Sequence, residues 1–210
     1  IAVLAFVASG WRLAVFTVLS MIYMVIAGYW NESMNTLALV LIAVPLAVCT
    51  GLLLGIVAYK SPRVDRFVQP MLDLMQTVPT FAYLIPILLL FGFGPVVGLI
   101  ASAIYACPPM VRNTILGLQR VPSDVVESGV MSGATKVQLL WLVRIPSALP
   151  TIMIGVNQTV MAGLAMVIIA AIIGSSADMG WEVLSTMRKA RFGDSLLAGL
   201  VIVLIAMIMD

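Results

Sequence analysis

Long runs without a charged residue constrain the fold of this chain more than any other feature. One such run extends from Leu13 to Trp30, and the next extends from Met34 to Ala58. An uncharged apolar run of about 18 residues or more predicts a helix that crosses a lipid bilayer. Hydrophobic residues make up 62% of the chain and charged residues 10%, whereas soluble domains carry about 25% charged residues. The chain is therefore predicted to be an all-α membrane protein, built as a polytopic helix bundle.

Further apolar spans continue this pattern toward the C-terminus. They are Leu72–Phe91, Val96–Met110, Thr151–Gly174 and a last span that ends at Met209. Pro79 and Pro86 interrupt the first of these, and Pro108-Pro109 is expected to end the second, because proline lacks the N–H that a helix interior needs. Ile1–Ser9 is interpreted as the tail of a cut transmembrane helix, since it lacks the charged leader and the cleavage site of a signal peptide.

Two glycines in the second span, Gly51 and Gly55, are four residues apart. This spacing lets another helix backbone approach closely in a membrane. The pair is equally compatible with two glycines that are merely tolerated in a long helix. Both interpretations remain open from the sequence.

Positive charge predicts the orientation of the spans, because Lys and Arg are enriched in cytoplasmic loops. The positive residues gather in three places: Arg12, the cluster of Lys60, Arg63 and Arg66, and the group of Arg112, Arg120, Lys136 and Arg144. Alternating spans put all three inside, and put Glu32 and the Gly92–Pro95 turn outside. The same alternation places Ser175–Asp194 outside, where Trp181 is expected to anchor a short surface helix.

Val121–Pro150 differs from its surroundings because it is a moderately polar segment between apolar spans. The pairs Asp124–Glu127 and Thr135–Gln138 each have the spacing of a capping box, which predicts two helix starts. Gly133 lies between them, where the end of a helix favours a residue in the left-handed conformation. Pro146 is expected to end the second helix. The segment is thus predicted to form two short helices suited to docking another protein.

The same segment resembles a known family. Glu127-Ser128-Gly129, then Gly133, then Ile145-Pro146 and Leu149-Pro150 resemble the EAA signature of ABC-importer permeases, in which Glu-Ala-Ala is followed by Gly and, after a spacer, by Ile and Leu-Pro. Ser128 and Gly129 replace the two alanines, and both remain small. Asp73–Pro79, Pro108–Arg112 and Pro150–Thr159 are similar to the glycine betaine/proline/choline branch of the family. The resemblance runs from about Thr36 to Gly174.

The resemblance implies a type I ABC-importer transmembrane domain over residues 34–210, preceded by N-terminal transmembrane helices in residues 1–33. It also implies that a cytoplasmic ATPase grips the helix pair within 121–150, the coupling region. The ATPase-coupling residues would be Glu127, Ser128, Gly129, Gly133, Ala134 and Thr135, and the end of the motif would be Ile145, Pro146, Leu149 and Pro150. The alternative is a loop pair that packs only on its own bundle.

The resemblance further implies partners. These are two cytoplasmic ABC ATPase subunits, a second permease copy, and an extracytoplasmic substrate-binding protein or fused domain. ATP and Mg would be held by the partner ATPase, and the chain itself is expected to bind no cofactor, no metal and no nucleic acid. The implied location is the bacterial cytoplasmic (inner) membrane. The implied solute is a compatible solute such as glycine betaine, proline, choline or carnitine.

Polar residues within the spans are candidates for lining a translocation pathway. They are Gln76, Thr77, Pro79, Asn157, Gln158, Thr159 and Met161. An amide or hydroxyl without a partner is costly in hydrocarbon, so the polar members of this set should face protein or water. Hydrogen bonds that join helices are an equally good explanation for them.

No enzyme site is recognisable in the sequence. The chain contains no histidine and no GxxxxGK[ST] phosphate-binding loop, so the energy for transport is expected to come from a separate ATPase. An ion-coupled secondary transporter or channel is the alternative function. That class normally places a charged residue inside the membrane, and the predicted spans contain only Asp73, at an edge.

Overall fold

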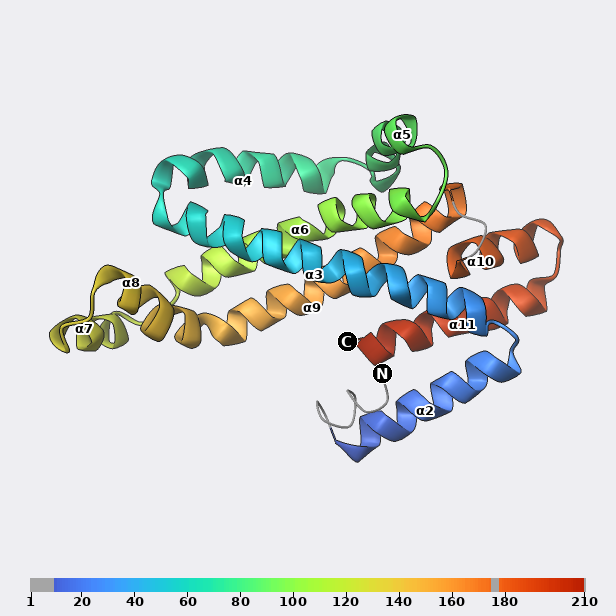
Figure 1. Ribbon diagram of the computed structural model, residues 1–210, viewed down its shortest axis with the longest axis horizontal. Helices are drawn as coiled ribbons and strands as arrows, with labels where there is room; N and C mark the ends of the chain where they lie inside the picture. Colours follow the sequence, from blue (N-terminus) through green and yellow to red (C-terminus); the bar gives the residue numbers. More distant parts are fainter. Residues whose placement is uncertain (1–9, 175–177, 210) are drawn as a thin grey trace. The chain divides into compact units, whose positions relative to one another are not determined.

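The computed structural model describes residues 10–174 and 178–209, and every regular element within these ranges is helical. The expectation for Ile1–Ser9 lies outside the described residues. In chain order the elements are α2 (Trp11–Ile26), α3 (Trp30–Lys60), α4 (Pro62–Thr77), α5 (Thr80–Phe91), α6 (Pro95–Gln119), α7 (Ser123–Met131), α8 (Lys136–Gln138), the π-helix η1 (Leu139–Arg144), α9 (Ile145–Gly174), α10 (Met179–Arg188) and α11 (Phe192–Met209) (Figure 1).

Four of the described helices are long and apolar enough to cross a membrane: α3, α6, the continuous helix Lys136–Gly174, and α11. The pair α4 and α5 passes the same test together, but the two helices are separated by a break. The apolar helix α2 is shorter, with 16 residues. The spans expected from the uncharged runs are thus present as helices. The structure corrects three expectations about proline, because Pro86, Pro108-Pro109 and Pro146 lie within helices.

The third predicted span is interrupted at Pro79, as expected, but not at Pro86. It begins inside α4, and Val78-Pro79 separates α4 from α5, while Pro86 lies inside α5 without ending it. Pro79 terminates α4 because a residue before proline is driven into an extended conformation, and Val78 indeed has ψ 129°. The polar stretch before this span is mostly helical as well, since only Ser61 separates α3 from α4.

Pro108-Pro109 does not end the fourth span, because α6 continues to Gln119. Helix α3 approaches α6 at this point. A Cβ atom placed on Gly51 would lie 3.1 Å from the Cys107 carbonyl oxygen and 2.6 Å from Met110 Cβ. Close packing of a neighbouring helix compensates for the donors that proline removes from a membrane helix. Tertiary packing therefore overrides the local signal, and it places Arg112 and Asn113 inside a helix.

The contacts divide the chain into two compact units. Unit 1 comprises Ile1–Val44, Pro79–Tyr105 and Val160–Asp210, and unit 2 comprises Pro45–Val78 and Ala106–Thr159. The long helices α3, α6 and α9 each contribute residues to both units.

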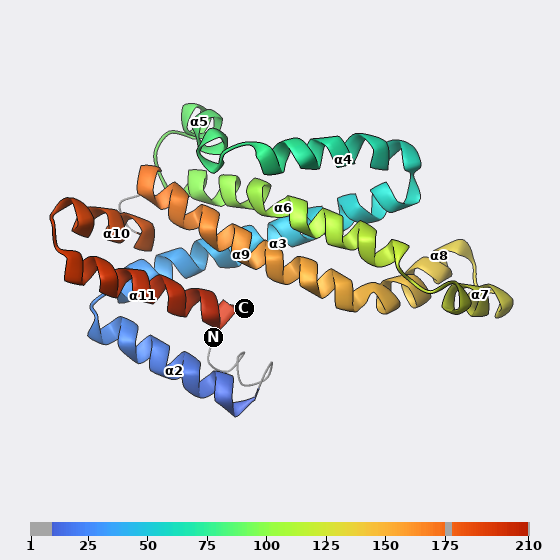
Figure 2. The same cartoon turned by 180° about the vertical axis from the view of Figure 1, so that it is seen from behind.

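Unit 1 is built around a buried apolar cluster: Leu84, Ile87, Val97, Ala101, Met166 and Ala170. Helix α2 lies beside α11, and α10 folds back on α11, as Figures 1 and 2 show. The Met179 N–H donates a hydrogen bond of 3.1 Å to Thr36 Oγ1, which ties the start of α10 to α3. The short helix expected after the fifth span is therefore present in α10, but it is docked, with Met179 and Gly180 buried and Trp181 half-buried.

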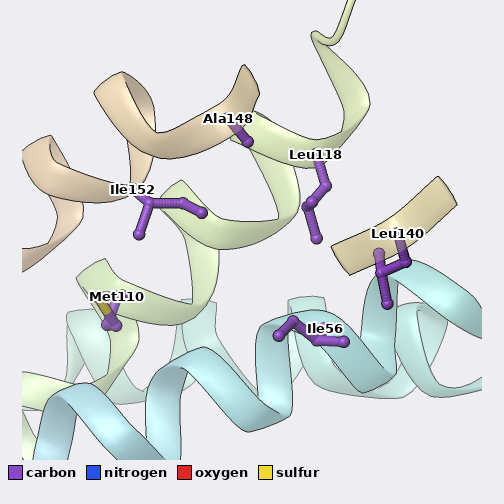
Figure 3. Close-up of a cluster of buried hydrophobic side chains, with 6 residues drawn as sticks. All are labelled: Ile56, Met110, Leu118, Leu140, Ala148 and Ile152. Atoms are coloured by element: carbon purple, nitrogen blue, oxygen red, sulfur yellow. The ribbon is translucent and has the colours of Figure 1, made fainter. Parts of the chain in front are cut away.

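Unit 2 has two apolar clusters. Figure 3 shows the first, in which side chains of α3, α6, η1 and α9 converge: Ile56, Met110, Leu118, Leu140, Ala148 and Ile152. The second joins α3, α4 and α6 through Ala58, Leu72, Val111 and Ile115. A Cβ atom on Gly55 would lie 2.6 Å from Thr114 Cβ. Gly51 and Gly55 thus permit close approach of α3 and α6, which decides between the two interpretations of this pair.

Candidate coupling site and polar face of unit 2

Helix α7 ends in the geometry that Gly133 predicts. Gly133 has φ +78°, and its N–H donates to the Val130 carbonyl oxygen at 2.9 Å. The Ala134 N–H donates to the Gly129 carbonyl oxygen at 3.1 Å. These two bonds form a Schellman motif, which satisfies carbonyl groups that the end of a helix leaves free. The turn fixes the direction in which the chain leaves α7.

Helix α8 begins at the predicted capping box. The Gln138 N–H donates to Thr135 Oγ1 at 3.3 Å, and the Thr135 N–H donates to Gln138 Oε1 at 2.9 Å. Gly129 places α7 against η1, since a Cβ atom there would lie 2.8 Å from Leu139 Cδ1 and 3.2 Å from Val143 Cγ2. Figures 1 and 2 show α7 and α8 side by side where α6 ends and α9 begins.

The first capping box, at Asp124 and Glu127, does not form. Pro122 takes the N-cap position and the helix begins at Ser123, so Asp124 already lies in the first turn. There its negative charge complements the helix dipole, and its carboxylate accepts a hydrogen bond of 3.3 Å from Ser123 Oγ. Ser128 donates its hydroxyl to the Asp124 carbonyl oxygen at 2.7 Å, and Glu127 is exposed.

Pro146 does not end the second helix. Residues Lys136–Gly174 form one continuous helix of 39 residues, with the π-helix Leu139–Arg144 directly before Pro146. The wider π turn offers a route past a proline, whose ring clashes with a carbonyl of the preceding turn in a regular α-helix. In the motif end, Ile145 is half-buried, and Pro146, Leu149 and Pro150 are exposed.

Exposed apolar side chains cover the helix pair, and sequence reasoning did not single them out. Met131 is 90% exposed and Leu142 is 71% exposed. Val130, Val137 and Trp141 are exposed as well. Exposed apolar side chains on a short segment between membrane spans are candidates for a protein interface. The sequence signal was the apolar pair Val130-Met131 at the end of α7, directly before the Ser132-Gly133 turn.

The helix pair is also connected to α3. The Arg144 guanidinium carbon lies 5.5 Å from the centre of the Tyr59 ring, a cation–π contact between η1 and the last turn of α3. Arg144 therefore connects η1 to α3 as well as contributing a positive charge.

The pathway candidates fall into different environments. Gln76 and Thr77 are exposed at the end of α4, and Thr77 donates to its own helix at the Leu74 carbonyl oxygen, 3.0 Å away. Asn157 and Gln158 are exposed on α9. Thr159 is completely buried, so its side chain does not reach that surface. Pro79 is exposed and Met161 half-buried, both in unit 1.

Two polar contacts of α6 were missed because Pro108-Pro109 was interpreted as the end of the helix. Arg112 Nη2 donates to Asp73 Oδ1 on α4. The next residue, Asn113, donates through Nδ2 to Gln158 Oε1 on α9 at 2.9 Å and to the Pro109 carbonyl oxygen at 2.8 Å. Consecutive residues of α6 thus make polar contacts with two different helices of unit 2.

Comparisons with known proteins give matches over most or all of the chain. The family model described as "Binding-protein-dependent transport system inner membrane component" matches residues 47–210. The glycine betaine/proline betaine transport system permease protein ProW of Salmonella typhimurium is 44% identical over 209 residues, which cover 100% of this chain and 59% of ProW. The glycine betaine transport system permease protein OpuAB of Bacillus subtilis is 41% identical over 198 residues, 94% of this chain and 70% of OpuAB.

A relative that is named for a different solute has a similar sequence identity. The trimethylamine N-oxide transport system permease protein TmoV of Ruegeria pomeroyi is 42% identical over 209 residues, 100% of this chain and 32% of TmoV. The chain thus spans about a third of the length of TmoV and about three fifths of that of ProW.

Solved structures share the fold. An inward-facing structure of the MetNI methionine ABC transporter matches with a TM-score of 0.73 at 19% identity, covering 84% of this chain and 89% of that chain. The crystal structure of an amino acid ABC transporter with histidines matches with a TM-score of 0.70 at 20% identity, covering 90% of this chain and 92% of that chain. These matches confirm the helical membrane fold expected from the sequence.

Proposed function

We propose a function from one premise: this chain belongs to the family of binding-protein-dependent transport system inner membrane components. It is a multi-pass component of the inner membrane with the type I ABC-importer fold, and it is not itself an enzyme. We propose that it is the permease subunit of an ATP-driven importer. In this proposal two cytoplasmic ATPase subunits hold ATP and Mg, and an extracytoplasmic binding protein or fused domain delivers the solute.

The observation that carries the proposal is the exposed apolar surface on α7, α8 and η1, which we call the coupling surface. It consists of Val130, Met131, Val137, Trp141 and Leu142. The Schellman turn at Gly133 and the capping box at Thr135 fix the two helices relative to each other. An ATPase that contacted Met131 would therefore act on a defined helix pair. Glu127, Ser128, Gly129, Gly133, Ala134 and Thr135 remain the proposed coupling residues, and Ile145, Pro146, Leu149 and Pro150 the proposed motif end.

The position of the coupling residues explains their types. Gly129 faces η1, where a side chain would collide with Leu139. Ser128 satisfies its hydroxyl on its own helix, and Glu127 remains exposed for a polar contact with the ATPase. Small residues against η1 and an exposed apolar end leave α7 supported on one side and open on the other. This is the arrangement that a docking helix needs.

The proposed passage involves the exposed polar face of unit 2. Asn157 and Gln158 lie inside a helix that is apolar enough to cross the membrane, and amides are costly against lipid tails. We infer that this face of α9 contacts water or a second permease copy. Gln76, Thr77, Pro79 and Met161 stay in the proposed pathway. Thr159 is better explained as part of the packing of unit 2.

The proposed solute is a small compatible solute that carries a quaternary amine, such as glycine betaine. Support comes from ProW and OpuAB, whose names state glycine betaine transport. TmoV is named for trimethylamine N-oxide, which also carries methyl groups on a nitrogen atom. The common chemistry is a compact polar solute with a methylated nitrogen.

Reconstitution of the full transporter tests the proposal. ATP-dependent uptake of labelled glycine betaine into proteoliposomes is expected with all subunits present and absent without the ATPase. Met131→Asp should release the ATPase in co-purification, because a carboxylate would enter an apolar contact, whereas Ser123→Ala at the other end of α7 should not. Uptake that persists without any ATPase would reject the importer and favour the ion-coupled alternative. ATPase binding by Met131→Asp at the wild-type level would reject the coupling surface.

A further inference from the structure

The ion pair of Asp73 and Arg112 is unusual for its position, because both residues lie on the exposed side of unit 2. The Asp73 side chain is 66% exposed and the Arg112 side chain 37%. Arg112 uses Nη2 for the Asp73 carboxylate, and its buried Nε has no hydrogen-bond partner among the described residues. The pair therefore presents an exposed carboxylate next to a partly exposed guanidinium.

The position of Arg112 within α6 argues against contact of the pair with lipid tails. Arg112 lies seven residues before Gln119, the end of α6, which corresponds to about 10 Å along the helix at about 1.5 Å per residue. Helix α6 is one of the candidate membrane spans. Charged side chains inside a membrane face a water-filled cavity or the interior of the bundle. The surface around Asp73 and Arg112 must therefore meet water or protein.

We propose that Asp73 and Arg112 form a transient binding site for a zwitterion that carries a carboxylate close to a quaternary ammonium. The inference rests on the proposed function, and it assigns a solute-contacting site to the permease itself. The Arg112 guanidinium would bind the solute carboxylate through paired N–H···O bonds. The Asp73 carboxylate would attract the ammonium, which has no N–H group to donate.

A solute that binds here has to replace the contact between Asp73 and Arg112, and this favours a zwitterion over a solute with a single charge. An exposed ion pair adds little to stability, so the pair opens at little cost. A zwitterion then gives each residue a partner of the same charge as the one it lost. A cation or an anion alone would replace only one of the two contacts, so it should bind less tightly than a zwitterion that replaces both.

Neighbouring residues keep the site in place. Asn113 follows Arg112 on α6 and uses its amide hydrogens on Gln158 and on the Pro109 carbonyl oxygen. The buried cluster of Leu72, Val111 and Ile115 packs α4 on α6 directly beside the pair. The two charged side chains are thus held next to each other by apolar contacts that do not depend on the ion pair.

Cysteine protection in the full transporter tests the site. Leu74→Cys, in a background with Cys49→Ala and Cys107→Ala, places a thiol at an exposed position next to Asp73 on α4. Without ATP, glycine betaine at about twice its dissociation constant should slow labelling of this thiol about threefold. Choline and propionate, which each carry one of the two charges, should not slow it at the same concentration. Phe67→Cys, exposed two turns earlier on α4, is the control position and should be labelled at the same rate throughout.

Substitution of the pair completes the test. Arg112→Gln should abolish the protection of the Leu74→Cys thiol, whereas Arg191→Gln, which removes the guanidinium from the Arg191–Asp194 pair of unit 1, should leave it intact. Protection that survives Arg112→Gln, or that choline alone produces, would overturn the inference. Uptake of glycine betaine by the Leu74→Cys transporter is measured in parallel. Normal uptake without protection contradicts the site alone, whereas no ATP-dependent uptake by the wild-type transporter contradicts the proposed function.

Discussion

At the scale of the residue, Gly55 shows how the absence of a Cβ atom lets two helices approach each other closely. Its Cα lies against α6, where a Cβ atom would be 2.6 Å from Thr114 Cβ and 3.0 Å from the Val111 carbonyl oxygen. Van der Waals packing between helices drives association in a membrane, where lipid tails remove the hydrophobic effect. The close approach of α3 to α6 therefore depends on glycine at this position.

We predict that Gly55→Ala lowers the free energy of unfolding by about 1–3 kcal/mol, the usual cost of overpacking. Gly199→Ala in α11 is the matched control, because a Cβ atom there meets no atom within 4 Å. The control should be neutral or slightly stabilising, since alanine has the higher helix propensity. Denaturant unfolding of both variants in detergent measures the difference. Equal stability of the two would contradict the close approach.

Tyr29 is a single residue that makes the folding stability depend on pH. Its hydroxyl donates to the Asp194 carbonyl oxygen at 3.2 Å. Burial raises the pKa of Tyr29 above 10.0, and the negative charges of Asp194 and Glu182 raise this pKa further. A raised pKa means that the folded state favours the neutral hydroxyl. Its contribution to stability is complete below the pKa of the unfolded chain and is lost as the pH rises through the folded pKa.

We therefore expect the melting temperature of the wild type to fall more steeply between pH 9 and pH 11 than that of Tyr29→Phe, which lacks the ionisable hydroxyl. Below pH 9 the variant should be slightly less stable, because the hydrogen bond to Asp194 is lost. Thermal unfolding across this range measures both effects. Parallel pH profiles of the two proteins would argue against the burial of this hydroxyl.

At the scale of the element, α7 and α8 were predictable in outline. Gly133 and the Thr135–Gln138 pair act through local backbone geometry, and a local rule applies to them directly. The Asp124–Glu127 capping box does not form because the N-cap is Pro122, two residues before the expected Asp124. Pro108-Pro109 and Pro146 failed for another reason: a neighbouring helix and a π turn accommodate these prolines. Neither can be recognised without the tertiary structure.

The missed polar contacts follow from the same cause. Once Pro109 was interpreted as a helix end, Arg112 and Asn113 were assigned to a loop, where their side chains need no partner. In the structure they lie within α6 and contact Asp73 and Gln158. Asp73 and Gln158 are separated by 85 positions in the sequence, so no local pattern connects them.

Replacement of Gly133 tests the turn between the two helices. Gly133→Val should uncouple ATP hydrolysis from uptake, because a β-branched residue strains the left-handed conformation by about 1–2 kcal/mol and redirects the chain after α7. Gly133→Asn should retain most coupling, since asparagine adopts this conformation more readily. The ratio of solute transported to ATP hydrolysed, with solute capture measured separately, is the readout. Equal coupling in both variants would remove the role assigned to the turn.

The capping box gives a prediction for α8. Thr135→Ala removes the side-chain acceptor for the Gln138 N–H and should destabilise the start of α8 by about 0.5–2 kcal/mol. Ser132→Ala is a suitable control, because its hydroxyl donates only to the Ser128 carbonyl oxygen within α7. Hydrogen exchange at Val137 and Gln138 should accelerate in the first variant and stay unchanged in the second. Identical exchange would show that the box does not support the helix.

At the scale of the whole molecule, substitution of an exposed amide of α9 tests whether these amides line a passage for the solute or only pack helices together. We expect Asn157→Leu to reduce ATP-driven uptake while assembly with the ATPase continues, because the substitution removes a polar group from the surface that we assign to the solute. Thr159→Val is the internal control. Thr159 Oγ1 is buried without a hydrogen-bond partner among the described residues. Removing this hydroxyl group should therefore change stability and uptake very little. Aggregation of Asn157→Leu would favour a role in helix packing.

The uninterrupted helix from Lys136 to Gly174 fixes an angular register between the capping box and the amides of α9. Each residue of an α-helix turns the chain by about 100°. Removing one residue from the regular α-helix between Ile145 and Val156 would therefore turn Asn157 and Gln158 by about 100° around the axis relative to Thr135. Loops elsewhere in the chain can vary in length, but this segment has to keep its count.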